Sequence, residues 1–265
     1  MAEQELRIAA GVDVGTECVK AAIASEDGQV LGRAVMPTRG YFQACVYEVL
    51  AAALDDAQRK EEDLVGIGAT GFGMDCVPKA THTATEAACH ALGAFQHVRH
   101  AMTLVNIGGR DPHVITVDGE GRRTAARGAR RCALGIGSFL MFTARHLDVS
   151  PTRLQELASA AHDGPARVSS YCSVFSASEV LERLREGATR EEIALGCIHS
   201  IAERIIEIGG FADPVVVCGG VAEYFPGVLG ALEAQSGLKV RAVADPIFTA
   251  ALGAALRVFR PALEA

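Results

Sequence analysis

The sequence has no apolar run long enough to cross a membrane, and its first residues, Met1 to Arg7, are largely polar. It therefore predicts neither a membrane-spanning helix nor a secretion signal, and we expect a cytoplasmic protein without a membrane partner. In a reducing cytoplasm, the eight cysteines of the chain are not expected to form a disulfide framework.

Two further features are missing. The chain has no C-x-x-C pair and no Cys/His spacing typical of zinc sites, which argues against a zinc centre closed within it. It also lacks an excess of positive charge, because it contains 25 Lys and Arg residues but 32 Asp and Glu residues, which gives a formal net charge of -7. A nucleic-acid partner is therefore not expected, since phosphate backbones attract clustered basic residues. The short basic run 121–131 is the local exception.

What the chain does have suits an α/β protein. Its 265 residues are 49% hydrophobic and include 28 glycines, enough for one large or two medium domains with many tight turns.

A strand–loop–strand unit opens the chain. The apolar run 6–14 leads into the loop Asp13-Val14-Gly15-Thr16, a second strand is predicted at 19–24, and a hairpin turn at 26–29 leads to a third strand at 30–36. Gly15 would let backbone amides approach a phosphate, Thr16 could donate a hydrogen bond to it, and Asp13 could hold a magnesium-bound water. An ordinary β-turn explains the same residues equally well.

The same strand–loop–strand pattern recurs later in the chain. A strand predicted from residue 101 leads into Gly108-Gly109-Arg110-Asp111, and a second strand follows at 112–117. This duplication resembles actin-like ATPases of the sugar kinase, Hsp70 and actin superfamily, whose two α/β domains flank a nucleotide cleft. We expect that fold, with residues 1–100 and 250–265 in one domain and 101–249 in the other. Gly219 and Gly220, after a buried strand, occupy the place where such proteins lay glycines against the adenosine.

Two cysteines stand at the start of predicted helices. Cys132 precedes Gly135, Gly137 and an apolar run, and Cys172 precedes an amphipathic segment. A helix N-terminus lowers the pKa of a thiol and favours an anionic centre such as a thiolate or an iron–sulfur cluster. The alternative is two small, half-buried residues without chemistry, which is how Cys18, Cys89, Cys197 and Cys218 are interpreted from their apolar surroundings.

Glu86 and His90 lie one turn apart on a predicted helix at 83–94. The pair could serve as a metal or acid–base site, but the spacing is more typical of a simple contact on one helix face.

Together these motifs resemble the ATPase family that contains the activators of 2-hydroxyacyl-CoA dehydratases and the ATP-binding subunits of ATP-dependent benzoyl-CoA reductases. The resemblance covers nearly the whole chain, and the two cysteines with their flanking residues are its most discriminating part. The motifs that carry it are Gly11-Val-Asp-Val-Gly-Thr16, Asn106-Ile-Gly-Gly-Arg-Asp111, Cys132 with Gly135-Ile-Gly137, Cys172-Ser-Val-Phe-Ser-Ala-Ser-Glu-Val180, Cys218-Gly-Gly-Val-Ala222 and Ala251-Leu-Gly-Ala-Ala255.

The resemblance implies a dimer of actin-like subunits that share one [4Fe–4S] cluster, with Cys132 and Cys172 as the metal ligands from this chain. It also implies ATP and Mg²⁺ as cofactors, with Asp13 and Asp111 as catalytic residues. The implied partners are a homologous ATPase subunit, iron–sulfur subunits that bind and reduce the substrate, and reduced ferredoxin as electron donor. The implied nucleotide contacts are Gly15, Thr16, Gly108, Gly109, Arg110, Gly219 and Gly220.

The chain departs from the family pattern near the first cysteine. Ala129-Arg130-Arg131 precedes Cys132 where the family has Asn-Asp-Lys, and the usual Gly-Gly-Gln-Asp loop has Arg110 as its third residue. These changes are more similar to the delta-type subunit of a benzoyl-CoA reductase than to a free activator. The expected function is therefore an ATP-hydrolysing electron-activation subunit of an aryl-CoA reductase. Alternatives are an activator of a 2-hydroxyacyl-CoA dehydratase, a small-molecule kinase of the actin-like superfamily, and a partner that binds nucleotide without hydrolysing it.

Overall fold

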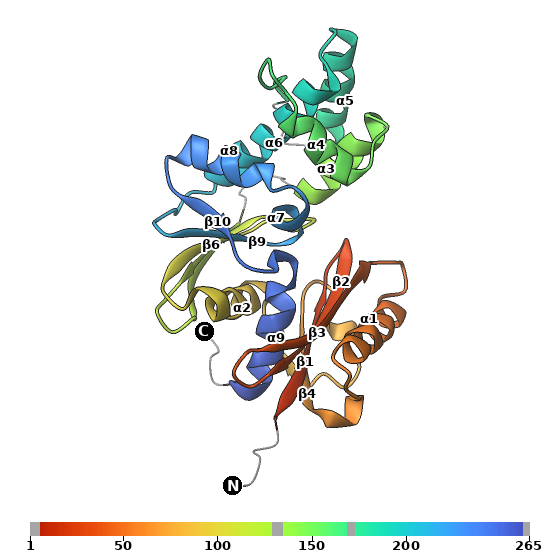
Figure 1. Cartoon of the computed structure of the whole chain (residues 1–265), viewed down its shortest axis with the longest axis vertical. Coiled ribbons are helices and arrows are strands. Elements are labelled where there is room, and N and C mark those ends of the chain that lie inside the picture. The colour runs from red at the N-terminus through yellow and green to blue at the C-terminus, as the bar shows by residue number, and fades with distance from the viewer. Residues whose placement is uncertain (1–5, 129–134, 169–172, 262–265) are drawn as a thin grey trace. The chain divides into compact units, whose positions relative to one another are not determined.

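The chain divides into two compact units, and the computed structural model describes residues 6–128, 135–168 and 173–261 (Figure 1). The first unit contains residues 1–101, 116–125 and 248–265, and the second contains residues 102–115 and 126–247.

The first sheet has five strands in the order β3-β2-β1-β4-β5. Strands β1 (Ile8–Val14), β2 (Cys18–Ser25) and β3 (Val30–Pro37) form an antiparallel meander. Strands β4 (Leu64–Thr70) and β5 (His82–Thr83) extend it in parallel on the other side of β1. The central strand β1 is buried along its whole length, which explains why Asp13 is its only residue with a polar side chain.

Within the described residues, two helices cover this sheet and a third packs on one of them. Helix α1 (Phe42–Asp56) packs against β2 and β3, whereas α9 (Thr249–Phe259) packs against β1, β2 and β4 and pairs with α2 (Glu86–Val98). Short 3₁₀ turns lie at Glu61–Asp63 and Met74–Cys76. Helix α2 begins three residues later than its apolar pattern predicts, because Thr85 accepts a hydrogen bond from the amide of Ala88 and caps the helix.

The second sheet has the order β10-β9-β6-β7-β8. Its strands are β6 (Met102–Asn106), β7 (His113–Val117), β8 (Arg123–Gly128), β9 (Val215–Cys218) and β10 (Val240–Ala242), and β9 runs parallel to both β6 and β10. Read from β8, the order repeats that of the first sheet, with β6 in the central place of β1. The predicted duplication is therefore present in the topology.

The described part of the second unit contains six helices. They are α3 (Ile136–His146), α4 (Pro151–Ser159), α5 (Ser173–Arg185), α6 (Arg190–Ile206), α7 (Gly220–Tyr224) and α8 (Gly227–Ser236), and a 3₁₀ turn at Pro246–Phe248 leads into α9. Helix α6 buries one stripe, Ile193, Cys197, Ile201 and Ile205, as its spacing predicts. Ile208, which continues the same spacing in the sequence, lies beyond the end of the helix.

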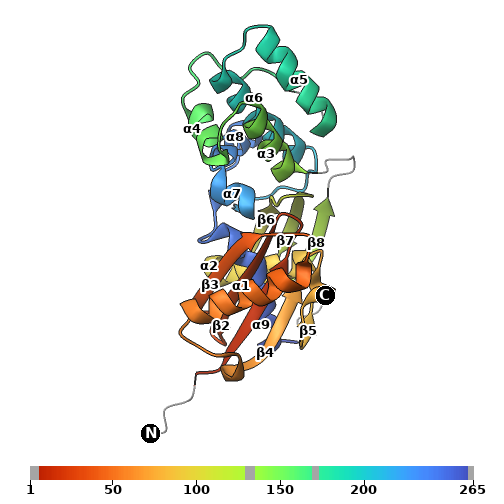
Figure 2. The ribbon, with the colours of Figure 1, turned by 90° about the vertical axis from the view of Figure 1, so that its right-hand side faces the viewer.

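The basic run 121–131 contains an element that its composition did not suggest. Its residues 123–128 form the edge strand β8, which lies beside β7 (Figure 2) and is exposed over most of its length. Charged side chains on an edge strand discourage pairing with other chains, so Arg123 and Arg127 have a structural explanation.

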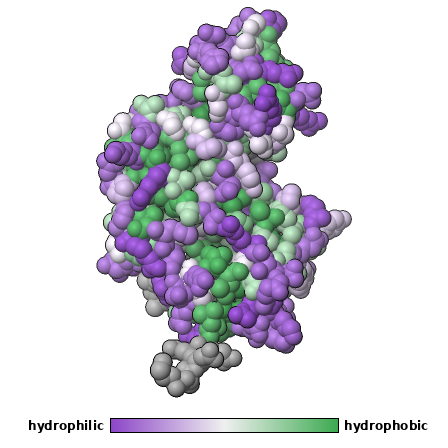
Figure 3. All heavy atoms as spheres, viewed as in Figure 1, coloured by the Kyte–Doolittle hydropathy of each residue, from purple (hydrophilic) through white to green (hydrophobic). Residues whose placement is uncertain are grey.

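The exposed surface is mixed. The face in Figure 3 shows both hydrophilic residues and patches of apolar residues. Among the described residues, no helix combines the length and the apolar composition needed to cross a membrane.

Cys89, Cys197 and Cys218 are buried as their apolar surroundings predict, whereas Cys18 is only half-buried. Burial raises the pKa of the Cys197 thiol from 9.0 to about 12, and its Sγ lies 3.7 Å from the hydroxyl of Thr143. Burial likewise raises the pKa of Cys89 to about 11. These thiols are core residues rather than nucleophiles.

Cys197→Ala is expected to lower the free energy of unfolding at pH 8, because it leaves a small cavity. The folded pKa of this thiol exceeds the unfolded one, so between pH 9 and 12 the unfolded chain binds fewer protons. The wild type should therefore lose up to about 1.4 kcal/mol per pH unit in that window, a loss that the variant lacks. Urea unfolding of both proteins from about pH 8 to about pH 10.5 should show that the difference between their free energies of unfolding becomes smaller. A difference that stays constant over this range would contradict the raised pKa of the buried thiol.

Candidate functional site

The loop of the first unit is built around Asp13, the penultimate residue of β1. Its side chain is only 4% exposed, and Oδ2 lies 3.0 Å from Nζ of Lys20. Lys20 stands directly opposite Asp13 in the β1–β2 register. Although burial by itself lowers the pKa of Lys20, the charge and hydrogen bond of Asp13 raise it above its ordinary value. The motif pattern missed Lys20, although hairpin register could have found it.

The other carboxylate oxygen of Asp13, Oδ1, has no such partner among the described residues. Oδ1 is buried and accepts no hydrogen bond from any residue that the structure describes. A buried carboxylate oxygen without a donor is unfavourable, so such a group often belongs to a site that takes a water or an ion. The donor type also suits Mg²⁺, which prefers oxygen ligands and keeps several of its waters. Asp13 therefore fits the predicted role.

Gly15 and Thr16 form the tip after β1. The amide of Gly15 donates to the carbonyl of Cys18 (3.1 Å), and the hydroxyl of Thr38 donates to the carbonyl of Gly15 (2.8 Å). The Gly15 amide, which the sequence predicts to face a phosphate, thus closes the hairpin. Thr16 remains half-buried at the tip, where its hydroxyl is the better candidate donor.

The loop of the second unit follows β6 and contains Gly108, Gly109, Arg110 and Asp111. Gly108 borders open space, since a side chain there would meet nothing within 4 Å. Arg110 Nε lies 2.9 Å from Asp111 Oδ2, with both side chains partly exposed at 44% and 37%. An ion pair this exposed contributes little to stability.

This loop also holds the beginning of helix α3. The carbonyl of Arg110 accepts hydrogen bonds from the amides of Gly135 (3.2 Å) and Ile136 (3.3 Å), and the carbonyl of Gly109 accepts one from Ser138 (3.3 Å). Gly137 permits this approach, because a β-carbon there would lie 2.7 Å from the Cα of Gly109. The candidate phosphate loop and the helix after Cys132 are therefore one packed unit.

Cys132 and Cys172 themselves lie outside the described residues. A helix follows each cysteine, and α5 begins at Ser173. Helix α3, however, begins at Ile136, four residues after Cys132, because Gly135, predicted to lie in the first turn, is instead the N-cap with a φ of +86°. The two helices contact one another in the second unit. Among described residues, no group of three or more His, Cys, Asp or Glu side chains could hold a metal ion.

Gly219 and Gly220 follow β9. Gly219 has a φ of +96°, its amide donates to the carbonyl of Pro246 (2.8 Å), and a β-carbon there would lie 2.5 Å from the carbonyl oxygen of Ile107. Packing within the chain therefore explains the glycine at 219. Gly220 has more room, because a β-carbon there would meet only the Ile247 side chain, at 3.8 Å. It is the better place for a ligand to approach the backbone.

Glu86 and His90 contact one another on one face of helix α2. His90 is buried, with Nδ1 2.7 Å from Thr249 Oγ1 and Nε2 3.6 Å from Glu86 Oε1. The histidine thus joins α2 to the first residue of α9, in agreement with the helix-face interpretation.

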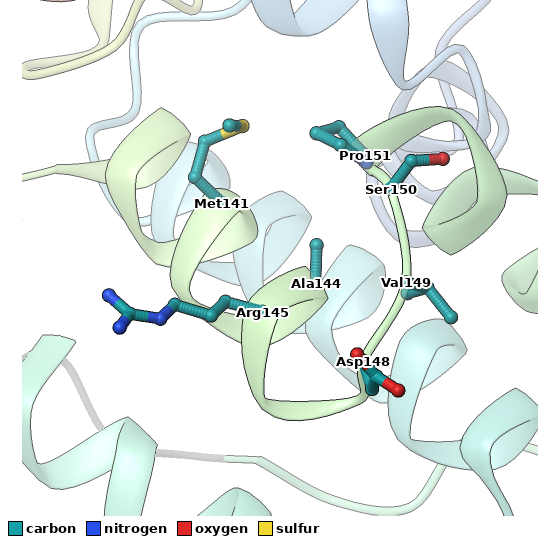
Figure 4. A pocket seen from close by; sticks show the side chains of 7 residues that line it. All are labelled: Met141, Ala144, Arg145, Asp148, Val149, Ser150 and Pro151. Atoms are coloured by element: carbon teal, nitrogen blue, oxygen red, sulfur yellow. The ribbon is translucent and has the colours of Figure 1, made fainter.

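An open hollow of about 490 Å³ lies at the turn between α3 and α4 (Figure 4). It contains none of the predicted site residues. Its lining residues are Met141, Ala144, Arg145, Asp148, Val149, Ser150 and Pro151.

Three characterised relatives match the chain over almost its full length. The (R)-2-hydroxyglutaryl-CoA dehydratase activating ATPase of Acidaminococcus fermentans is 32% identical over 258 residues, covering 96% of this chain and 98% of the relative. The activator of lactoyl-CoA dehydratase from Anaerotignum propionicum is 34% identical over 255 residues, covering 95% and 97%. A benzoyl-CoA reductase subunit of Thauera aromatica is 28% identical over 263 residues, covering 95% and 93%.

Solved structures agree. Component A of the A. fermentans dehydratase superposes with a TM-score of 0.89 at 30% identity, covering 97% of this chain and all of that one. The activator of 2-hydroxyisocaproyl-CoA dehydratase from Clostridium difficile, with bound ADPNP, has a TM-score of 0.87 at 26% identity, covering 96% and 95%.

A ROK family glucokinase from Streptomyces griseus shares the fold alone, with a TM-score of 0.60 at 12% identity over 94% of this chain and 98% of that one. The predicted actin-like α/β fold is confirmed. Residues 10–258 also match one family of ATPases. On its repeated sheets, its two candidate loops and this match, the chain belongs to the BadF/BadG/BcrA/BcrD ATPase family.

Proposed function

We propose that this chain is the ATP-hydrolysing electron-activation subunit of an aryl-CoA reductase of the benzoyl-CoA type. In this proposal it passes low-potential electrons from a [4Fe–4S] cluster, shared with a second ATPase subunit, to subunits that reduce the substrate. The observation that carries the proposal is the contact between the loop 108–111 and the N-terminus of α3. It joins a candidate nucleotide loop directly to the helix that follows a predicted cluster ligand.

The ATPase chemistry is assigned to the two loops. Asp13 and Asp111 would hold Mg²⁺ and orient the attacking water, while Lys20 compensates negative charge beside Asp13. Thr16, Gly108, Gly109 and Arg110 would contact the phosphates, together with Gly15, whose amide serves the hairpin. Phosphoryl transfer depends mainly on such positioning and charge compensation. Gly219 and Gly220 would flank the adenosine, with Gly220 the more open of the two.

The cluster ligands in the proposal are Cys132 and Cys172. When bound there, the cluster would supply a one-electron donor of low potential. Adding an electron to an anionic cluster is unfavourable, and the positive ends of α3 and α5 would offset part of that cost. ATP can drive the remainder only if it binds two arrangements of the loop and helix with different affinities. Movement of the Gly109 and Arg110 carbonyls would displace the start of α3.

A second candidate partner is a 2-hydroxyacyl-CoA dehydratase, for which the chain would be the activator. The identity to dehydratase activators, up to 34%, exceeds the 28% to the reductase subunit. The substitutions at Arg110 and at Arg130-Arg131 favour the reductase instead. A sugar kinase function shares only the fold and leaves both cysteines without a role.

Anaerobic purification of the tagged chain with its native partners separates these functions. A stable brown complex with further iron–sulfur subunits, hydrolysing ATP and accepting electrons from reduced ferredoxin, is expected for the reductase. A brown dimer that separates from its partner indicates the activator. A colourless protein that lacks iron and sulfide and phosphorylates a sugar would contradict the proposal.

A further inference from the structure

We propose that Gly71 is a positioning residue that sets the orientation of the Asp13 carboxylate. The inference rests on the proposed role of Asp13 in ATP hydrolysis. It concerns contacts within the first unit alone and adds a residue to which no nucleotide-binding motif of the sequence pointed.

The strand register brings Gly71 to Asp13. Strands β1 and β4 run parallel with Asp13 opposite Thr70, the last residue of β4, and Gly71 follows directly. The loop then lies across the end of β1, where the amide of Gly73 donates to the carbonyl of Val14 (2.9 Å).

Gly71 leaves no room for a side chain. Its φ is +88°, and a β-carbon built on it would lie 2.5 Å from Asp13 Oδ1 and 2.7 Å from the Val14 carbonyl oxygen. Neither neighbour is the free end of a flexible chain: Val14 O is backbone, and Asp13 is held by Lys20. Any residue other than glycine must therefore displace the carboxylate, the end of β1 or both.

A side chain at residue 71 would displace Asp13 Oδ1, the oxygen proposed to face the metal-bound water. Lys20 holds Oδ2 at 3.0 Å, while Gly71 lies against Oδ1, the oxygen without a hydrogen-bond donor among described residues. The carboxylate is thus fixed by a charge on one side and by a backbone surface on the other. This leaves Oδ1 oriented for a metal-bound water without engaging it in a hydrogen bond.

The test compares Gly71→Ala with Gly187→Ala. Gly187 has a similar φ of +94°, but a β-carbon there would meet nothing within 4 Å. The two variants share backbone strain, and they differ in the collisions with Asp13 and with the Val14 carbonyl, which only Gly71→Ala introduces. Gly71→Ala should lower kcat for ATP hydrolysis by about tenfold or more and raise the Mg²⁺ concentration for half-maximal rate, since small displacements of catalytic groups have large effects. Gly187→Ala should stay within about twofold of wild type in both quantities.

Equal effects of the two variants, or an unchanged Mg²⁺ dependence in Gly71→Ala, would overturn the inference. If Gly71→Ala does not fold, Gly71→Asn with Gly187→Asn repeats the comparison, because asparagine tolerates a positive φ better than alanine does.

A stability measurement separates this inference from the proposed function. In urea unfolding, the midpoint shift caused by Gly71→Ala should be clearly smaller in an Asp13→Ala background, where Oδ1 is absent. Equal shifts in both backgrounds would show that Gly71 does not act on Asp13. Absence of ATP hydrolysis by the wild type would instead refute the proposed function and leave this coupling measurable.

Discussion

Asp13→Ala is expected to reduce ATP hydrolysis by at least about a hundredfold, because it removes the carboxylate proposed to orient magnesium-bound water. The variant should also unfold more easily. Lys20 Nζ lies 3.0 Å from the Asp13 carboxylate with 15% of its side chain exposed, and a buried charge that loses its partner costs about 3–5 kcal/mol. Phosphate release at saturating ATP and Mg²⁺, beside a urea unfolding curve, measures both effects.

Two further variants separate catalysis from folding. Asp13→Ala combined with Lys20→Met removes both charges, so the double variant should recover stability without recovering hydrolysis. Asp55→Ala, on the exposed side of α1, changes a carboxylate that the site does not use and should hydrolyse ATP at the wild-type rate. Undiminished hydrolysis by a folded Asp13→Ala protein would remove Asp13 from the active site.

Cys132→Ala and Cys172→Ala are each expected to abolish the visible absorbance of the shared cluster. Each subunit is proposed to supply two of the four thiolates that a [4Fe–4S] cluster requires, so either substitution in this chain leaves at most three ligands. The second unit should remain folded, because its core is formed by apolar side chains of α3, α4, α6 and β9. Iron and sulfide analysis of the anaerobically purified complex, beside far-ultraviolet circular dichroism, measures cluster and fold separately.

Cys76→Ala is the matched control, since Cys76 is a half-buried free thiol of the first unit. It should retain full iron, sulfide and colour. A complete cluster in either the Cys132 or the Cys172 variant would show that the ligands have been assigned to the wrong residues.

Several features of the fold follow from local sequence. Mostly apolar runs identify β1 and β6 as buried central strands, and the loops after them contain similar Gly and Asp residues, so the duplication is visible without coordinates. Helix α6 can also be predicted from local sequence, because Thr189 and Glu192 form a capping box before apolar residues that recur every four positions. In each case the determining contacts lie within a few residues of one another.

Other features depend on contacts between distant segments. The sequence motifs identify Asp13 but neither Lys20, which acts through hairpin register, nor Gly71, which acts through parallel pairing with β4. The sequence does not reveal strand β8 within its basic run, because an edge strand buries too few side chains to require an alternating apolar pattern. Gly219 is predicted to face a nucleotide, whereas the carbonyl of Ile107 already requires a glycine there.

The sequence by itself therefore determined the family, the duplicated α/β fold and the residue types at the two loops, because these are expressed in short motifs and local periodicity. Only the tertiary structure decided which amides are already engaged, which oxygen of Asp13 is left without a donor among the described residues, and which loop holds the start of α3. The physical reason is that hydrogen bonds and close approaches of this kind join residues far apart in the chain, and no local pattern records them.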